Sequence, residues 1–480
     1  MYSSLLYDQS TPVALYGQLK EYFKDEITML FESVVTTEDG NFSFITIGAK
    51  EQIQYINNKT IYIKGDKKEE LESDPFSFLQ EYYKKINQKR FKELAKEVGF
   101  SFVDGFIGYI GYDMVKVFEP SLKPYMDNLK DEINIADLDL VRPKIIIGFS
   151  HKSSILTIID IDNSNKDMFL KVQDIIISSH KLEPIKKAYL EGEGKFSIDA
   201  TRFMEIVKEA KEHIKAGDIF QVLASNRYIQ KGKVDKVSFY RILRSKNPSP
   251  YLFLIDFNDF AICGSSPEVM VRLSDKEILL RPIAGTRKRG KSAKRDYELE
   301  QELINDPKER AEHLMLVDLG RNDVGRVAKV GSVKVPEMMR VERYSHVMHL
   351  VSDVIGQIED DKDMFDLFRA TFTAGTMTGA PKIKAMELIA KFEGLKRSFY
   401  SGSVGYFSFS GDMDSAIAIR TALIKDDEVI LQAGAGVVAD SIPKLEELEV
   451  RNKLMALFAT LQELANLDED KELLVLKEVE

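Results

Sequence analysis

The chain has 480 residues, of which 44% are hydrophobic and 30% charged, and its formal net charge is −10. This length predicts about three domains, and this composition excludes disordered, collagen-like and disulfide-scaffold proteins. The acidic balance excludes an electrostatic footprint for nucleic acid, and the single cysteine, Cys263, excludes an internal disulfide. The first twenty residues do not resemble a signal peptide, and no run of eighteen apolar residues occurs, so we expect a cytoplasmic protein without a membrane partner.

The N-terminal part of the chain contains predicted strands and one predicted helix. Residues 26–35 and 41–49 are rich in β-branched and aromatic side chains and flank a turn cluster, which predicts paired strands. Residues 76–98 have apolar side chains at helical spacing, which predicts one amphipathic helix. Residues 105–114 (GFIGYIGYDM) lack the Lys-Ser/Thr ending of a phosphate loop, and we interpret them as a strand with close backbone packing.

Beyond residue 190 the pattern changes, so we expect an N-terminal domain over residues 1–190, a second domain over 191–465 and a charged tail over 466–480. Short strands there are predicted at residues 251–257, 260–264, 269–273, 405–410, 415–424 and 429–434. Long helices are predicted from Ala200, Asp306, Phe365 and Ser441. This mixture predicts an α+β protein built on large sheets.

The helix predicted from Asp306 begins with a pair of glutamates. Asp306 is a typical N-cap, and Pro307 occupies the first helical position. Glu309 and Glu312 follow, three residues apart, and therefore lie on one face of the helix.

The helix predicted from Ser441 repeats this arrangement with Glu446 and Glu449, and Lys453 follows one turn later. Each glutamate pair alone is consistent with surface charge that stabilises a helix N-terminus. Two such pairs can instead converge on one hard cation such as Mg²⁺, which proteins hold with one or two carboxylates, waters and substrate oxygens.

Three glycine-rich segments, residues 281–290, 373–382 and 432–441, are each typical of turns and together offer backbone N–H groups to an anionic ligand. Arg420 interrupts the apolar run 415–424, which indicates either a structural salt bridge or an anionic ligand. His349 has the apolar neighbours of a core histidine. Nucleophile-elbow, dinucleotide and zinc-protease motifs do not occur, so the residues alone favour a Mg²⁺-dependent enzyme acting on a small anionic substrate.

Taken in order, these segments resemble the chorismate-utilising enzymes, and most closely the large subunits (component I) of anthranilate synthases. The matching segments are GDIFQV, NPSPYLF, GSSPE, RPIAGTRKRG, DPKERAEHLMLVDLGRND, VERYSHVMHLVSDV, AGTMTGAPKIKAMELI, GYFSFSGDMDSAIAIRT and AGAGVVADSIP, between about residues 217 and 453. Weaker matches, MLFESV, NFSF and GYIGYDM, extend through the N-terminal part. The resemblance implies large orthogonal β-sheets flanked by helices in the chorismate-binding domain, preceded by an α/β regulatory part.

The resemblance also implies a role for each acidic residue of the two helix starts. Glu312 and Glu449 would bind Mg²⁺ directly, and Glu309 and Glu446 would hold its waters. The ion would neutralise the ring carboxylate of chorismate, so that local charge, not net charge, decides the binding of a dianion.

The substrate contacts that the resemblance implies lie mostly in the C-terminal third of the chain. Tyr400 and Arg420 would bind the carboxylate of the enolpyruvyl arm, with Gly434, Gly436 and Lys453 close by. Together with the metal, these groups would fix both negative ends of the substrate.

The catalytic groups that the resemblance implies begin with Glu268 as the general acid that protonates the departing C4 hydroxyl. This role requires a raised pKa, because the carboxyl must hold a proton near neutral pH. The ring would be lined by Gly285, Thr286, His349 and Thr376, and His349 would take part in the later loss of pyruvate.

Two positions indicate the reaction type within the family. Members that add water carry a lysine where this chain has Gln221, and aminodeoxychorismate synthases typically carry a lysine where it has Ala284. The resemblance therefore implies attack by ammonia at C2, elimination of pyruvate and release of anthranilate. Because the chain has no glutaminase signature, a separate glutamine amidotransferase subunit would supply the ammonia in a hetero-oligomer.

The resemblance implies feedback inhibition by L-tryptophan at Ser33, Pro250, Tyr251 and Leu252. The serine and the Pro-Tyr pair of the regulated members are retained, whereas Asn41 replaces an arginine and Leu252 replaces a methionine. Ordinary sheet packing at a domain contact is the alternative for these positions.

Two other functions compete with this interpretation. The nearest is the aminodeoxychorismate synthase of the folate branch, against which Ala284 argues. The other is a catalytically silent subunit that keeps the fold, against which the retained Glu268, Arg420 and four acidic residues argue.

Overall fold

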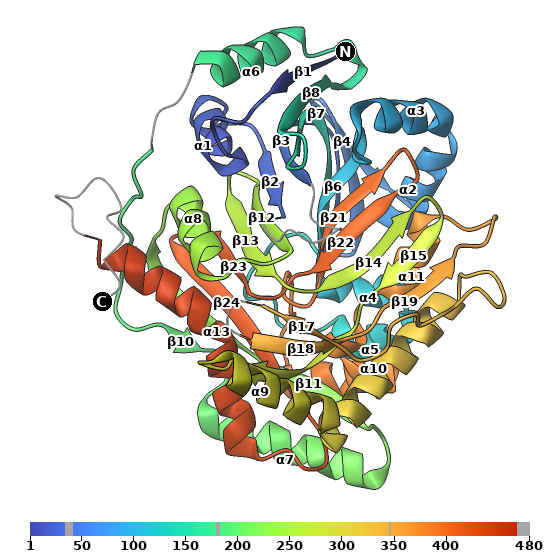
Figure 1. Ribbon diagram of the computed structural model, residues 1–480, viewed down its shortest axis with the longest axis vertical. Helices are drawn as coiled ribbons and strands as arrows, with labels where there is room; N and C mark the ends of the chain where they lie inside the picture. Colours follow the sequence, from blue (N-terminus) through green and yellow to red (C-terminus); the bar gives the residue numbers. More distant parts are fainter. Residues whose placement is uncertain (34–41, 179–182, 345–346, 468–480) are drawn as a thin grey trace.

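The computed structural model describes residues 1–33, 42–178, 183–344 and 347–467 (Figure 1). Within these ranges, hydrogen bonds link 21 strands into one sheet network, and three more strands form a separate small sheet. Helices lie around the outside of the sheets (Figure 1), which confirms the predicted α+β class with large sheets flanked by helices. No helix of the described ranges is long and apolar enough to cross a membrane.

The N-terminal strands are organised around β3 (Phe42–Ile56) and β7 (Leu138–Ser150), which pair antiparallel along most of their length. β3 also pairs with β2 (Thr28–Glu32), which confirms the predicted strand pair, although residues 34, 35 and 41 lie outside the described residues. The other strands of this part are β1 (Tyr2–Leu6), β4 (Lys59–Lys64), β5 (Lys67–Leu71), β6 (Gly105–Ile110) and β8 (Ile155–Asp160).

One arm of the network continues from β2 through five further strands, each antiparallel to the one before. They are β12 (Tyr251–Asp256), β13 (Phe260–Ser266), β23 (Thr421–Lys425), β24 (Glu428–Val437) and β11 (Gln221–Lys233). Three short strands pair with β11: β9 (Tyr189–Leu190), β10 (Lys195–Phe196) and β20 (Gly379–Ala380).

The other arm continues from β6. It contains β21 (Ser403–Ser408), β22 (Met413–Ile417), β14 (Val269–Ser274), β15 (Glu277–Leu280) and β19 (Val354–Gln357). The separate sheet contains β16 (Ile283–Lys288), β17 (Arg340–Arg343) and β18 (Val347–Val351). Since both arms join strands from either side of residue 190, the hydrogen bonding of the sheet is continuous across the predicted domain boundary.

The helices are α1 (Pro12–Tyr22), α2 (Pro75–Lys84), α3 (Gln88–Val98), α4 (Val115–Phe118), α5 (Lys123–Met126), α6 (Lys166–Ser178), α7 (Ala200–Ala216), α8 (Lys236–Lys246), α9 (Ala293–Asn305), α10 (Pro307–Gly325), α11 (Met364–Thr371), α12 (Lys382–Glu393) and α13 (Pro443–Ala465). The 3₁₀ turns are η1 (Tyr112–Met114), η2 (Pro120–Leu122), η3 (Ile161–Asn163) and η4 (Gly375–Met377). α13 packs against α7, α8 and β24. Its last turn precedes residues 468–480 of the predicted tail, which lie outside the described residues.

The predicted helix over residues 76–98 is wrong as a single element, because two helices, α2 and α3, occupy that segment. The side chain of Asn87 accepts a hydrogen bond from the backbone N–H of Arg90 and so caps a second helix start. Apolar periodicity continues across such a break, which is why the sequence pattern alone joined the two helices.

Two predicted helix starts also differ in detail. α13 begins at Pro443 with Ile442 as its N-cap residue, and the Ser441 hydroxyl instead accepts a hydrogen bond from the backbone N–H of Val438. The helix predicted from Phe365 is α11, which begins one residue earlier and has only 8 residues. In the first case, the hydrogen bond between Val438 and Ser441 forms a turn that delays the helix start. In the second, the helix is too short to show a clear apolar period in the sequence.

The predicted close packing at residues 105–114 is confirmed in β6. Gly108 has φ of +155°, and a Cβ atom there would lie 2.2 Å from the carbonyl oxygen of Asp139 in β7. On the other side of β6, Gly108 pairs with Gly405 of β21. β6 therefore connects β7 of the N-terminal strands to β21 of the second arm.

We expect Gly108→Ala to lower the free energy of unfolding by about 1–3 kcal/mol or more, because β7 must shift to admit a methyl group. Gly99→Ala is the matched control, since Gly99 has φ of +83° but open space around it, and it should cost only about 1 kcal/mol of backbone strain. Urea unfolding of both variants measures the difference. Equal losses would contradict the close packing at Gly108.

Candidate active site

The first turns of α10 and α13 bring the predicted acidic residues into one electrostatic neighbourhood. Asp306 caps α10 as predicted, and the Glu312 carboxylate accepts a hydrogen bond of 2.9 Å from the Gln221 side-chain amide on β11. Burial raises the pKa of Glu312, and the charges of Glu309 and Glu449 raise it further. Carboxylates from both helices therefore act on one another across the site.

Two cations, one on β16 and one further along α13, each pair with one of these glutamates. Arg287 pairs with Glu309 at 2.9 Å, and Lys453 pairs with Glu449 at 2.8 Å. Burial raises the pKa of Glu446, and the charge of Glu449 also raises it. Sequence reasoning missed Arg287, although it lies in the glycine-rich segment 281–290 that the sequence singled out.

These carboxylates can bind only a divalent ion that takes few protein ligands and fills its other coordination positions with water or substrate. Among the described residues, no group of three or more His, Cys, Asp or Glu side chains lies close enough together to hold a metal ion. An all-protein cage is therefore not formed by these residues. Mg²⁺, however, is commonly held by one or two carboxylates with waters and substrate oxygens, and Glu312 and Glu449, which act on each other electrostatically, would supply this donor set.

Glu268 lies between β13 and β14, and its side chain is buried at 7% exposure. The hydroxyl of Thr376, in the 3₁₀ turn η4, donates a hydrogen bond of 2.9 Å to the Glu268 carboxyl group. Burial raises the pKa of Glu268 to about 8, although Thr376 and the charge of Lys453 oppose the shift. At neutral pH this carboxyl group therefore holds a proton, as a general acid must.

His349, on β18, lies opposite Thr286 of β16 in the separate sheet. Its Nδ1 atom is 2.9 Å from the Gly285 carbonyl oxygen and 3.1 Å from the Thr286 hydroxyl. Because a carbonyl only accepts, Nδ1 carries the hydrogen and Nε2 is left to accept a proton. Burial lowers the pKa of His349, and Arg420 and Lys453 also lower it, so the imidazole is neutral.

Arg420 is not part of a strand, contrary to the sequence interpretation. It lies between β22 and β23 with φ of +53°, and its guanidinium donates to the backbone carbonyl of Lys453. Burial lowers the pKa of Arg420, and Tyr400 and Glu449 oppose this. Among the described residues, no carboxylate forms an ion pair with Arg420, which favours an anionic ligand over a structural salt bridge.

Tyr400 and Lys453 lie near this arginine, and Gly434 and Gly436 lie near Lys453 and Gln221, respectively. Tyr400 is buried, and burial raises its pKa. Lys453 donates a hydrogen bond of 2.8 Å to the carbonyl oxygen of Gly434 on β24. A Cβ atom at Gly436, one pleat further along, would lie 2.6 Å from the Gln221 amide nitrogen, so only glycine leaves that amide in place. The structure thus brings the predicted catalytic, metal and substrate-binding residues together.

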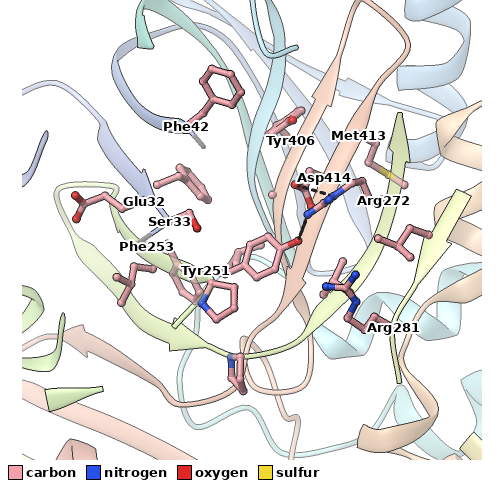
Figure 2. A pocket seen from close by; sticks show the side chains of 18 of the residues that line it. Glu32, Ser33, Phe42, Tyr251, Phe253, Arg272, Arg281, Tyr406, Met413 and Asp414 are labelled. Carbon is pink, nitrogen blue, oxygen red and sulfur yellow. Dashed lines mark hydrogen bonds and ion pairs between the residues drawn. The ribbon is translucent and has the colours of Figure 1, made fainter. Parts of the chain in front are cut away.

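A second candidate site is a cavity of about 670 Å³ between the two arms of the network (Figure 2). Ser33, Pro250, Tyr251 and Leu252, the four predicted tryptophan-binding residues, all line it, whereas Asn41 lies outside the described residues. The Ser33 hydroxyl is buried and has no hydrogen-bond partner among the described residues.

The floor of this cavity carries a polar triad that sequence reasoning missed. The Tyr251 hydroxyl donates a hydrogen bond of 2.9 Å to Asp414 and accepts one of 3.0 Å from Arg272. The guanidinium of Arg272 in turn lies 3.2 Å from the Asp414 carboxylate (Figure 2). Arg272 and Asp414 stand on neighbouring strands, β14 and β22, in direct register. Only the strand pairing brings them together, so no local sequence signal indicates the triad.

Residues that line the cavity lie next to two of the predicted catalytic residues, Glu268 and His349. Pro267 lines the cavity and directly precedes Glu268. Glu342 also lines it and pairs across β17 and β18 with His349, and the Tyr344 ring lies 5.7 Å from the His349 ring in an edge-on contact. A ligand in the cavity would therefore contact residues that adjoin both catalytic side chains.

Comparison with known proteins gives a consistent result. The family of chorismate binding enzymes matches residues 28–459. Anthranilate synthase component 1 of Aquifex aeolicus is 41% identical over 96% of this chain and 94% of its own length, and that of Acinetobacter calcoaceticus is 39% identical over 96% and 95%.

Solved structures agree with the sequence relatives. Anthranilate synthase component I of Streptococcus pneumoniae superposes with a TM-score of 0.75 at 31% identity, covering 89% of this chain and 94% of that one. The menaquinone-specific isochorismate synthase of Escherichia coli has a TM-score of 0.71 at 19% identity, over 96% and 94%, and shares the fold. The chain therefore belongs to the chorismate binding enzyme family. Within it, the relatives that it matches at about 40% identity are named anthranilate synthase component 1.

We expect Glu312→Gln to keep or raise stability in metal-free buffer, by no more than about 1 kcal/mol. Since the native state raises the pKa of Glu312, its ionised form is disfavoured on folding, and the parent loses stability as pH rises above the ordinary range of a glutamate. The variant's advantage should be larger at pH 7.5 than at pH 4, as measured by urea unfolding. A variant that is clearly less stable at pH 7.5 would show that the carboxylates do not repel one another.

Proposed function

We propose that this protein catalyses the reaction of anthranilate synthase component I. Chorismate and ammonia would be converted through 2-amino-2-deoxyisochorismate to anthranilate and pyruvate, the first step of tryptophan biosynthesis. The observation that carries the proposal is the 41% identity to a relative of that name over nearly the whole chain. The chemistry would come from the buried Glu268, which accepts a hydrogen bond from Thr376, and from Arg420, which forms no ion pair with a carboxylate of the described residues.

Substrate binding would use the cations and the amide-rich strands of the site. Arg420 and Tyr400 would hold the carboxylate of the enolpyruvyl arm, with the backbone around Gly434 and Gly436 against it. Mg²⁺, when bound by Glu312 and Glu449 with waters on Glu309 and Glu446, would neutralise the ring carboxylate. The two carboxylates of the substrate would thus be fixed at opposite ends of the ring.

The first half-reaction would transfer a proton from Glu268. As ammonia forms a bond to C2, the ring double bonds shift and the C4–O bond breaks, and the Glu268 proton leaves with the hydroxyl as water. Thr376 would orient the carboxyl group for this transfer. Gln221 is an amide that donates to Glu312 and cannot act as a base toward water, which supports amination over hydration.

In the second half-reaction the C2 proton would be removed, the C2–C3 double bond would form and complete the aromatic ring, and the C3–O bond would break. The arm would leave as enolpyruvate, which becomes pyruvate when its methylene carbon takes up a proton. His349 is neutral, and its Nδ1 hydrogen is held by the Gly285 carbonyl, so Nε2 is free to take a proton. We therefore assign His349 to this step and not to the amination. Gly285 and Thr286 would hold the imidazole against the ring.

A direct assay tests the proposal against its nearest rival. The protein is incubated with chorismate, Mg²⁺ and ammonium, with a parallel reaction in EDTA. Fluorescent anthranilate that forms only with Mg²⁺ supports the proposal. Accumulation of aminodeoxychorismate would instead favour the folate-branch enzyme, and absence of chorismate consumption would favour a silent subunit.

The ammonia would come from a separate glutamine amidotransferase subunit in a hetero-oligomer, and both proteins would lie in the cytoplasm. Ammonia is mostly protonated at neutral pH, so a partner that releases it next to the site would raise its local concentration. Turnover with glutamine plus the candidate partner, compared with ammonium alone, tests this part.

The pKa of Glu268 predicts an alkaline limit of activity. Because the acid must be protonated and its pKa is about 8, turnover at a fixed concentration of free NH₃ should fall as pH rises through about 8. Glu268→Gln cannot donate a proton and should lose at least about 10²-fold in kcat, whereas Glu277→Gln, on the exposed end of β15, should not. Activity that stays constant up to pH 9.5 would contradict the assignment of Glu268.

We also propose that the cavity in Figure 2 binds L-tryptophan as a feedback inhibitor. The unpartnered Ser33 hydroxyl would bind the amino-acid end, and Pro250 and the Tyr251 ring would cover the indole. Inhibition requires that tryptophan bind one of two conformations more tightly. Pro267 and Glu342, which line the cavity, are where such a difference would reach the catalytic groups.

Ser33→Leu should fill the cavity and raise the inhibition constant for tryptophan at least tenfold, with little change in uninhibited turnover. Ser153→Leu, at an exposed position, is the control. By linkage, chorismate should weaken tryptophan binding by the same factor as tryptophan weakens chorismate binding, which calorimetric titrations measure. If tryptophan does not bind at millimolar concentration, or inhibits Ser33→Leu equally, the regulatory proposal is wrong.

A further inference from the structure

We propose that Arg397, through its ion pair with Glu393, is a positioning residue that fixes two backbone segments relative to each other, the one that carries Thr376 and the one that carries Gln221. The inference rests on the proposed function, because the groups that it would position are those assigned to chorismate chemistry. Neither Arg397 nor Glu393 lines the cavity of Figure 2.

The ion pair lies just after the end of α12. Glu393 is the last residue of that helix, Gly394 turns the chain with φ of +64°, and Arg397 follows. The guanidinium binds the carboxylate through two hydrogen bonds, Nε to Oε2 at 2.9 Å and Nη2 to Oε1 at 2.6 Å. Arg397 is 1% exposed, so the pair is shielded from solvent.

The first backbone contact of Arg397 is next to Thr376, the residue that donates a hydrogen bond to Glu268. The Nη1 atom of Arg397 donates a hydrogen bond of 2.8 Å to the carbonyl oxygen of Met377. Met377 follows Thr376, whose hydroxyl donates to the Glu268 carboxyl group. The guanidinium therefore fixes the peptide that sets the position of the Thr376 hydroxyl.

The second backbone contact of Arg397 is on β11, two residues from Gln221, which donates a hydrogen bond to Glu312. The Nη2 atom of Arg397 donates a hydrogen bond of 2.8 Å to the carbonyl oxygen of Leu223 on β11. Gln221 lies two residues earlier on the same strand, and its side-chain amide donates to Glu312. One planar group thus connects η4 to β11.

Glu393, the ion-pair partner of Arg397, also binds β11. Its Oε1 atom accepts hydrogen bonds of 2.8 Å from both the backbone N–H and the hydroxyl of Ser225, also on β11. The guanidinium carbon of Arg397 lies 5.7 Å from the ring centre of Tyr400, the proposed substrate contact, and 4.7 Å from that of Tyr112. All five N–H bonds of Arg397 are used when the longer contact to the Ser401 hydroxyl, 3.4 Å, is included.

A function in positioning explains why a charge pair is placed here at all. Replacing a buried ion pair with apolar groups is often neutral or stabilising, so stability alone does not require one. A rigid guanidinium, in contrast, can hold two carbonyls and a carboxylate at fixed angles, which a lysine cannot. Catalytic geometry is sensitive to displacements of about 1 Å.

The chain supplies a matched control in Arg142, on β7. Its guanidinium also forms a buried two-point pair, with Asp104 at 2.9 and 2.6 Å, and it binds Glu51 at 3.0 Å. These partners all belong to the N-terminal part and include none of the residues assigned to the active site. Arg142→Lys should therefore cost stability without changing the chemistry.

The experiment compares Arg397→Lys with Arg142→Lys and the parent in the ammonium-dependent assay. Arg397→Lys should lower kcat at least tenfold while the KM for chorismate changes less than about threefold. Its alkaline limit of activity should move to higher pH, because the Thr376 hydrogen bond lowers the pKa of Glu268 and would weaken. Arg142→Lys should keep kcat within twofold and leave the pH profile unchanged, even if its melting temperature falls equally.

Several outcomes would overturn the inference. A parent-like kcat and pH profile in Arg397→Lys would assign the pair a purely structural role, and so would equal losses of kcat in both variants. If Arg397→Lys does not fold, Ser225→Ala, which removes one hydrogen bond to Glu393, should lower kcat two- to fivefold and move the pH limit in the same direction; no change there would also overturn it. An inactive parent would instead contradict the proposed function itself.

Discussion

The active site depends on the burial of one carboxyl group, that of Glu268, within the sheet network. Transfer from water disfavours its ionised form, and the hydrogen bond from Thr376 and the charge of Lys453 offset only part of that cost. The group therefore keeps its proton where a surface glutamate would lose it. In the proposed mechanism, the other groups would place an anionic ring against this acid, with cations and a metal ion at the two ends of the substrate.

The sheet network makes that placement possible with residues that are distant in the sequence. β11 and β24 pair over ten residues and carry Gln221, Gly434 and Gly436, while the two acidic helix starts converge from α10 and α13. The same network encloses the cavity of Figure 2 between its arms. Pro267 and Glu342 line the cavity and adjoin Glu268 and His349, respectively, so a change of shape in the cavity has a short route to those two side chains.

Local features of the sequence predicted the strands, the Asp306 cap and the close packing of β6, since each depends on neighbouring residues. Longer motifs, through their resemblance to a family, predicted which residues meet in the site. The break at Asn87, the left-handed Arg420 between two strands and the Arg272–Tyr251–Asp414 triad were not predictable in this way. Each results from a competing cap or from tertiary pairing, which apolar periodicity does not encode. The role of Arg397 was missed for the same reason: its Glu393 partner is four residues away, but the two carbonyls that it binds, those of Met377 and Leu223, belong to distant segments.

The proposed mechanism requires that Glu268 be protonated at neutral pH, and infrared difference spectroscopy measures this protonation state. Spectra of the parent minus Glu268→Gln, recorded from pH 5 to 10, isolate the carbonyl stretch of this one protonated carboxyl group. If Glu268 is protonated at neutral pH, the band is present at pH 7 and disappears with a midpoint near pH 8. A band that is already absent at pH 6, with the carboxylate bands in its place, would contradict the proposed mechanism.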